Sequence, residues 1–138
     1  MDKIVFVDAN AFLEIALQDK KSEECKDFFK KILANQIKAY TSDFIIYICL
    51  IQLQFKSKEN IKKMKEFLIF INSLNITVIK PTLNEIFKVF RLMEKYKLDF
   101  DDGLVVSCMT SNNIKTLASL DKDFDKVDII KREEPGKI

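Results

Sequence analysis

The stretch that most constrains the fold runs from Lys3 to Asn10 and reads Lys-Ile-Val-Phe-Val-Asp-Ala-Asn. Its first five residues are mostly apolar and β-favouring, which is typical of a strand covered on both faces of a parallel sheet. A helical pattern follows Asn10, so Asp8 is expected just past the carboxyl end of the strand, where open α/β sheets bind ligands. A buried charge is costly without a compensating cation. Asp8 therefore has two interpretations, the centre of an acidic metal site or the cap of the next helix.

Strand-like and helical patterns alternate along the rest of the chain, which predicts an α/β fold with a mostly parallel sheet. We expect one domain over residues 1–131 and a loose tail over 132–138, where Pro135 and Gly136 occur. The segment 43–55 is ambiguous, because its β-branched residues favour a strand while its length and a Thr41 or Ser42 cap allow a buried helix. The clearer elements are helices at 11–18, 21–36, 59–73 and from 82 onward, with strands at 37–41, 76–79 and near 114–120.

Composition excludes several kinds of chemistry. The 138 residues include no histidine and only two glycines, so neither a Ser-His or Cys-His nucleophile nor a glycine-rich phosphate loop is available. No apolar run is long enough to cross a membrane and no secretion signal is evident, so we expect a cytoplasmic protein. Cys25, Cys49 and Cys108 are widely spaced, and each is expected to be a buried, reduced thiol.

Aspartates recur where strands end and where one helix begins. Asp121 follows a short apolar strand as Asp8 follows the first, and Asp99, Asp101 and Asp102 precede an apolar helix. Parallel strands that each end in Asp bring these acids to one sheet edge, where crowded carboxylates repel each other unless a divalent cation neutralises them. Oxygen ligands of this kind suit Mg²⁺ or Mn²⁺. Gly103 is unexpected inside a helix and indicates a close approach to its backbone.

Three short motifs resemble one family. They are Val-Asp-Ala-Asn at 7–10, Phe-Asp-Asp-Gly-Leu-Val-Val at 100–106 and Ser-Leu-Asp-Lys-Asp-Phe at 119–124. Their order and separation resemble a PIN domain, most closely the small prokaryotic VapC-type toxin ribonucleases, over roughly residues 3–131. The resemblance implies a three-layer α/β/α fold, a helix over 43–55, and an endoribonuclease that uses Mg²⁺ or Mn²⁺. It also implies RNA as substrate, an antitoxin partner and a homodimer.

The resemblance also implies roles for individual residues. Asp8, Asp102 and Asp121 match the catalytic, metal-binding acids, and Asn10 matches the residue that orients Asp8. Three further residues would support the site. Asp101 is the competitor of Asp102 for its role, and Asp123 supports Asp121 or the metal-bound water. Ser119 either bonds the scissile phosphate or has a structural turn role. One departure is clear: the family has a glutamate near Ile48, whereas residues 45–54 contain no acid. Asp43 is the candidate substitute.

Three hypotheses follow for function. The first is a metal-dependent endoribonuclease, and the second is a PIN-like module of impaired activity that binds RNA or a protein partner. The third is a receiver-like α/β domain with an acidic pocket. It is disfavoured because no lysine follows a strand in the supporting position that such a domain needs. The five lysines between Lys56 and Lys65 either guide an RNA backbone or decorate a solvated helix face.

Overall fold

The computed structural model describes residues 3–138. At its centre lies a five-stranded sheet in the order β3-β2-β1-β4-β5, in which every neighbouring pair of strands is parallel. The parallel α/β architecture predicted from the sequence is confirmed, with β1 as the middle strand. The strands are β1 (Lys3–Val7), β2 (Ile37–Ser42), β3 (Thr77–Ile79), β4 (Thr116–Ala118) and β5 (Lys131–Glu133).

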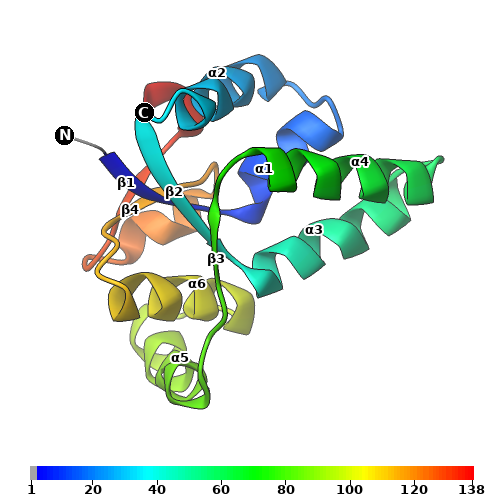
Figure 1. Cartoon of the computed structure of the whole chain (residues 1–138). Coiled ribbons are helices and arrows are strands. Elements are labelled where there is room, and N and C mark those ends of the chain that lie inside the picture. The colour runs from blue at the N-terminus through cyan, green and yellow to red at the C-terminus, as the bar shows by residue number, and fades with distance from the viewer. Residues whose placement is uncertain (1–2) are drawn as a thin grey trace.

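Helices cover both faces of this sheet, which makes a three-layer α/β/α fold (Figure 1). On one side α1 packs against α2 and α3, and α3 packs against α4, while α5 packs with α6 on the other side. The face changes because the chain moves outward from β1 to β3 and then returns to β4 on the far side of β1. The helices are α1 (Ala9–Ala16), α2 (Ser22–Leu33), α3 (Asp43–Lys56), α4 (Asn60–Ser73), α5 (Leu83–Tyr96) and α6 (Phe100–Ser111).

The middle strand is the core of the molecule. Val5, Phe6 and Val7 are fully buried, because β1 has a strand on each side and a helical layer on each face. Burying each such side chain contributes about 1.5–3 kcal/mol to folding. The residues that follow β1 therefore extend from a rigid strand. Because β2 lies on one side of β1 and β4 on the other, the carboxyl ends of β1 and β4 form the topological switch point of the sheet.

The ambiguous segment is a helix, as the family resemblance implied and contrary to its β propensity. Ser42 is the N-cap of α3, and its Oγ accepts a hydrogen bond from the backbone N–H of Ile45 at 3.2 Å. The fully buried residues Ile45, Cys49 and Leu53 are spaced four apart, so one stripe of the helix faces the core. Tertiary packing of that stripe outweighs the modest helix penalty of β-branched residues.

The segment expected to be a loose tail is part of the fold. Lys131–Glu133 forms the edge strand β5 beside β4, and the backbone N–H of Lys131 donates to the carbonyl of Lys115 at 2.7 Å. Pro135–Lys137 then makes a 3₁₀ turn that packs against α2, where the Lys31 ammonium donates to the carbonyl of Ile138 at 2.7 Å. The folded unit therefore continues beyond residue 131. A strand of three residues gives too short a pattern to detect from the sequence.

Gly103 lies where α5 and α6 meet. A Cβ atom at this position would stand 2.8 Å from the Cγ1 of Val89, a residue that is itself fully buried. The close approach expected from this glycine is therefore an approach of helix α5. It allows the two helices on this face of the sheet to pack tightly and to fix the first turn of α6, which carries Asp101 and Asp102.

Two sequence expectations concern the chain as a whole. Among residues 3–138, no helix is long and apolar enough to cross a membrane. In the same part of the chain Cys25, Cys49 and Cys108 are buried free thiols, as predicted. Burial raises the pKa of the Cys25 thiol to about 11 and that of Cys108 to about 12, so neither is poised to act as a thiolate nucleophile.

Candidate active site

Asp8 is the first residue after β1 and is only 7% exposed. Its backbone N–H donates to the carbonyl of Ala118 at 3.1 Å, which extends the pairing of β1 with β4. The Oδ1 atom of its side chain accepts a hydrogen bond from the N–H of Ala9 at 2.8 Å and caps α1. The capping interpretation is therefore confirmed for Oδ1, and it leaves Oδ2 to a second set of contacts.

Asn10 and Ser119 form that second set. The Oδ2 atom of Asp8 accepts from the Ser119 hydroxyl at 2.8 Å and from the Asn10 amide at 3.2 Å. The Asn10 amide also donates to the Ser119 Oγ at 3.0 Å, and its carbonyl accepts from the N–H of Leu120 at 3.0 Å. Asn10 thus ties the turn after β1 to the turn after β4, so the orientation of Asp8 depends on both.

Asp121 lies on the turn after β4, partly buried. Its N–H donates to the Ser119 Oγ at 3.1 Å, which connects it to the same network as Asp8. Its Oδ1 accepts from the N–H of Asp123 at 3.0 Å and caps the 3₁₀ helix η1 (Lys122–Lys126). Asp123 contributes a backbone N–H to this turn, while the residue itself is exposed.

Arg132 supports the turn after β4 and was not identified in the sequence. Its NH1 atom donates to the carbonyl of Ser119 at 3.0 Å, and its Nε and NH2 atoms donate to the Asp125 carboxylate at 2.8 and 3.2 Å. The side chain is 11% exposed. It lies in the segment expected to be loose, so nothing in the local pattern indicated that it reaches the site.

The third acidic group stands at the start of α6. Asp102 is partly buried and Asp101 is exposed, which favours Asp102 as the residue that faces the other acids. Asp99 is the N-cap residue by its backbone conformation, but within the described chain its side chain makes no capping hydrogen bond. The acids at this helix start are thus not explained by capping.

Burial and the charges of neighbouring acids make Asp8 and Asp102 difficult to ionise. Burial, opposed by the Ser119 and Ala9 hydrogen bonds and reinforced by the charges of Asp121 and Asp101, raises the pKa of Asp8 to about 6. Burial and the charges of its acidic neighbours, led by Asp101 and Asp8, raise the pKa of Asp102 to about 7. Acids on three separate segments therefore repel one another, and a bound cation would offset this repulsion.

The donor set fits a hard divalent cation. Asp8, Asp102 and Asp121 supply only carboxylate oxygens, the ligands that Mg²⁺ and Mn²⁺ prefer. In residues 3–138, no three acidic or cysteine side chains already converge as closely as metal ligands do. The fit is one of donor type and charge, and the side chains would draw together around the ion.

A family comparison agrees with this geometry. The model of the PIN domain matches residues 5–130, which is most of the chain. The chain belongs to the PIN domain family. No curated protein matches its sequence.

Solved structures show the same fold. VapC20 of Mycobacterium tuberculosis, a toxin that cleaves the sarcin-ricin loop, is 13% identical with a TM-score of 0.76, covering 92% of this chain and 97% of that one. VapBC2 of Rickettsia felis, bound to a promoter DNA fragment, is 15% identical with a TM-score of 0.74, covering 95% and 98%. DNA-bound VapBC of Salmonella typhimurium is 15% identical with a TM-score of 0.72, covering 98% and 99%.

The position at which the family resemblance implies a glutamate lies on α3. Ile48 is partly buried on the same turn as Cys49, whose Sγ donates to the carbonyl of Ala9 at 3.7 Å and whose pKa is raised by burial and by the charge of Asp8. This turn of α3 therefore lies near Asp8 and carries an isoleucine rather than an acid at position 48. Asp43 is not among the main charges acting on Asp8 or Asp102, and acts instead on the Cys108 thiol.

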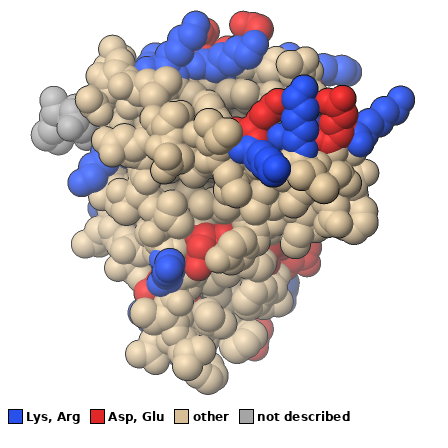
Figure 2. Space-filling view, turned by 45° about the vertical axis from the view of Figure 1, so that its right-hand side comes forward, with Lys and Arg blue, Asp and Glu red and all other residues tan. Residues whose placement is uncertain are grey.

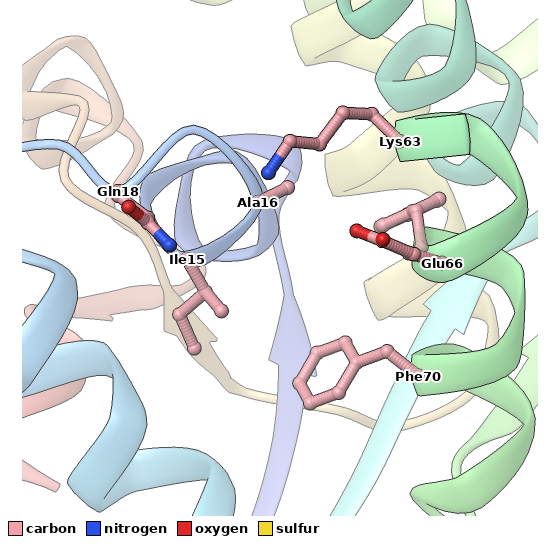
Figure 3. Close-up of a pocket in the computed structure, with 7 residues that line it drawn as sticks. Ile15, Ala16, Gln18, Lys63, Glu66 and Phe70 are labelled. Atoms are coloured by element: carbon pink, nitrogen blue, oxygen red, sulfur yellow. The ribbon is translucent and has the colours of Figure 1, made fainter. Parts of the chain in front are cut away.

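A pocket elsewhere on the PIN domain is separate from the acids. Lys63, Glu66 and Phe70 point from α4 towards residues at the end of α1 (Figure 3). Its lining combines apolar side chains with the opposite charges of Lys63 and Glu66. Its lining is Ile15, Ala16, Gln18, Lys63, Glu66, Phe67 and Phe70. Because none of the candidate site residues lines it, the chemistry of the acids does not depend on it.

The raised pKa of Asp8 predicts a pH-dependent cost in stability when no metal is bound. The carboxyl titrates near pH 3.8 in the unfolded chain and near 6 in the fold, so the wild type should lose stability as pH rises from about 4 to 7. Relative to Asp8→Asn, which cannot ionise, the loss should reach about 3 kcal/mol in the free energy of unfolding. Urea denaturation in EDTA at several pH values measures it.

The control for this experiment is excess Mg²⁺ at pH 7. It should restore the free energy of unfolding of the wild type and leave that of Asp8→Asn nearly unchanged. A free-energy difference between the two proteins that stays constant from pH 4 to 7 in EDTA would contradict the burial of an ionisable carboxylate at the end of β1.

Proposed function

We propose that this PIN domain is an endoribonuclease that depends on Mg²⁺ or Mn²⁺. The observation that carries the proposal is that Asp8, Asp102 and Asp121 lie close enough at the switch point for the charge of Asp121 to raise the pKa of the other two carboxyls. PIN domains are generally nucleases that use a divalent metal. A nuclease of this kind needs neither histidine nor a glycine-rich loop, which agrees with the composition.

The chain's own residues have distinct parts in this mechanism. Asp8, Asp102 and Asp121 would hold the cation, which when bound supplies an activated water and stabilises charge on the phosphate oxygens. Asn10 and Ser119 hold Oδ2 of Asp8 in one orientation. Arg132 holds the turn on which Ser119 and Asp121 lie. Such outer contacts often affect metal affinity or activity by about 10- to 100-fold.

We also propose that the protein is the toxin of a toxin-antitoxin pair. The structural neighbours include toxin-antitoxin assemblies, among them a complex from Klebsiella pneumoniae that is 12% identical over 95% of this chain. RNA is then the substrate and the antitoxin a separate chain. The supporting observation on this chain is the shared fold over nearly its full length.

A homodimer is the assembly that the surface supports. Leu83, Phe87 and Phe90 are 75%, 70% and 50% exposed and lie along one stripe of α5. An exposed apolar stripe of this kind is typical of a protein interface. Figure 2 shows that charged side chains on one face of the molecule stand in separate groups with broad uncharged surface between them. A second copy of the chain would cover such a surface.

The lysines at the turn between α3 and α4 support RNA binding less directly. Lys56 and Lys58 are exposed, while Lys62 is paired with Glu59 at 3.6 Å and Lys63 lines the pocket beside α1. The group is therefore partly committed to contacts within the protein. We assign it an electrostatic part in guiding the RNA backbone and no part in the chemistry.

The second candidate function is an impaired module that binds RNA or a protein partner. Ile48 favours it, because the turn of α3 beside Asp8 offers no carboxylate where the family has one. A site with fewer acids holds a divalent cation less tightly. The two functions differ in one measurable property, which is whether the remaining acids hold the metal well enough to cleave.

Cleavage of a mixed, fluorescently labelled RNA tests the proposed function. We expect cleavage with Mg²⁺ or Mn²⁺, none in EDTA, and a loss of at least about 100-fold for Asp8→Asn, because the site loses the charge of a ligand. Asp27→Asn removes an exposed carboxylate from α2 and should cleave as the wild type does. A folded wild type that is inactive with both metals would favour the binding module, and cleavage that survives Asp8→Asn would contradict the site.

Restoring an acid to α3 tests the departure from the family. Ile48→Glu should raise the affinity for Mn²⁺ by about 10-fold or more, because it adds a carboxylate beside Asp8. Isothermal titration calorimetry measures the change. Ile51→Glu adds the same charge at an exposed position of the same helix and should leave the affinity nearly unchanged. Equal affinities for the two variants would show that position 48 does not reach the metal.

A further inference from the structure

Phe100 is an aromatic residue that precedes the acids of α6 in the sequence. It is the first residue of α6, immediately before Asp101 and Asp102, and it is 37% exposed. The most exposed phenylalanines of the described chain, Phe55 and Phe87, lie at the end of α3 and on the outer stripe of α5. Phe100 differs from these because it belongs to the same first turn of α6 as Asp102.

A second ring holds Phe100 in place. The rings of Phe44 and Phe100 meet edge to face, with centroids 6.1 Å apart and an interplanar angle of 88°. Phe44 is the second residue of α3 and follows the carboxyl end of β2, the strand next to β1. The pair therefore stands at the same edge of the sheet as Asp8, and an edge-to-face partner leaves an aromatic face free.

Ile48 continues this apolar surface. It lies four residues after Phe44 and so on the same side of α3, and both residues are partly buried. The position that is a glutamate in the family is thus an aliphatic side chain in line with two aromatic rings. Phe44 and Ile48 thus follow β2 on one side of β1, whereas Ser119 and Asp121 follow β4 on the other side.

We propose that Phe100, backed by Phe44, stacks an unpaired base of the RNA next to the phosphate at the acids. This inference rests on the proposed ribonuclease function. The phosphate of a substrate belongs at the acids with their cation, and the nearest apolar, planar parts of the same strand are its bases. Exposed aromatic rings bind unpaired bases by stacking, whereas bases inside a duplex are not accessible to them. The base that stacks on Phe100 is therefore one that is unpaired in the substrate.

Abasic RNA tests this proposal. The wild type is first used to map the cut in a short single-stranded RNA, and each base that flanks the cut is then replaced in turn by an abasic site. Wild type, Phe100→Leu and Phe100→Tyr are compared on intact and abasic RNA. Phe55→Leu makes the same change at an exposed phenylalanine away from the acids. Thermal unfolding of each variant confirms that it is folded.

On intact RNA, Phe100→Leu should lose at least about 5-fold in kcat/KM, mainly through KM, while Phe100→Tyr and Phe55→Leu keep the wild-type value. On the RNA that lacks the stacked base, wild type and Phe100→Leu should be equal. A merely structural role would not produce that equality. Two results would overturn the stacking proposal but not the ribonuclease function. One is a wild-type kcat/KM for Phe100→Leu on intact RNA, and the other is an equal loss of kcat/KM by wild type and Phe100→Leu when the base is removed. No metal-dependent cleavage by the wild type would overturn the proposed function as well.

Discussion

The carboxylate of Asp8 is 7% exposed and follows three fully buried residues of the middle strand. A charge at such a position has few ways to be stabilised. One of its oxygens caps α1, and the other accepts hydrogen bonds from Ser119 and Asn10. These contacts lower the pKa but do not offset the effect of burial, so the pKa remains raised to about 6. Only a nearby positive charge would stabilise the ionised carboxylate further, and the charges of the neighbouring acids destabilise it.

Several features away from Asp8 serve to hold this arrangement. The return of the chain from β3 to β4 brings the carboxyl ends of β1 and β4 together, and Gly103 lets α5 pack closely against α6, whose first turn carries Asp102. Arg132 fixes the turn after β4 from the edge strand β5. Functional sites commonly lower the stability of a protein, and the crowded carboxylates at this edge of the sheet are expected to do so here.

Much of the fold and of the candidate site follows from the sequence. The buried strand before Asp8, the alternation of strands and helices, and the acids after strands all predict the architecture and the meeting of Asp8 with Asp121. The helix over 43–56 did not follow from propensity, because it depends on the Ser42 cap and on core packing. The edge strand β5 and Arg132 did not follow either, because their contacts are made with residues distant in the sequence. The unexpected glycine at position 103 indicated a close approach to the backbone, but the sequence did not indicate that Val89 is the residue that approaches.

The central claim is that the acids at the switch point form a cation site, and anomalous diffraction from crystals soaked in Mn²⁺ tests it most directly. The account predicts an anomalous peak within about 2.5 Å of carboxylate oxygens from Asp8, Asp102 and Asp121, absent in Asp8→Asn. No peak at these residues at a saturating Mn²⁺ concentration, or a peak that Asp8→Asn leaves unchanged, would contradict it.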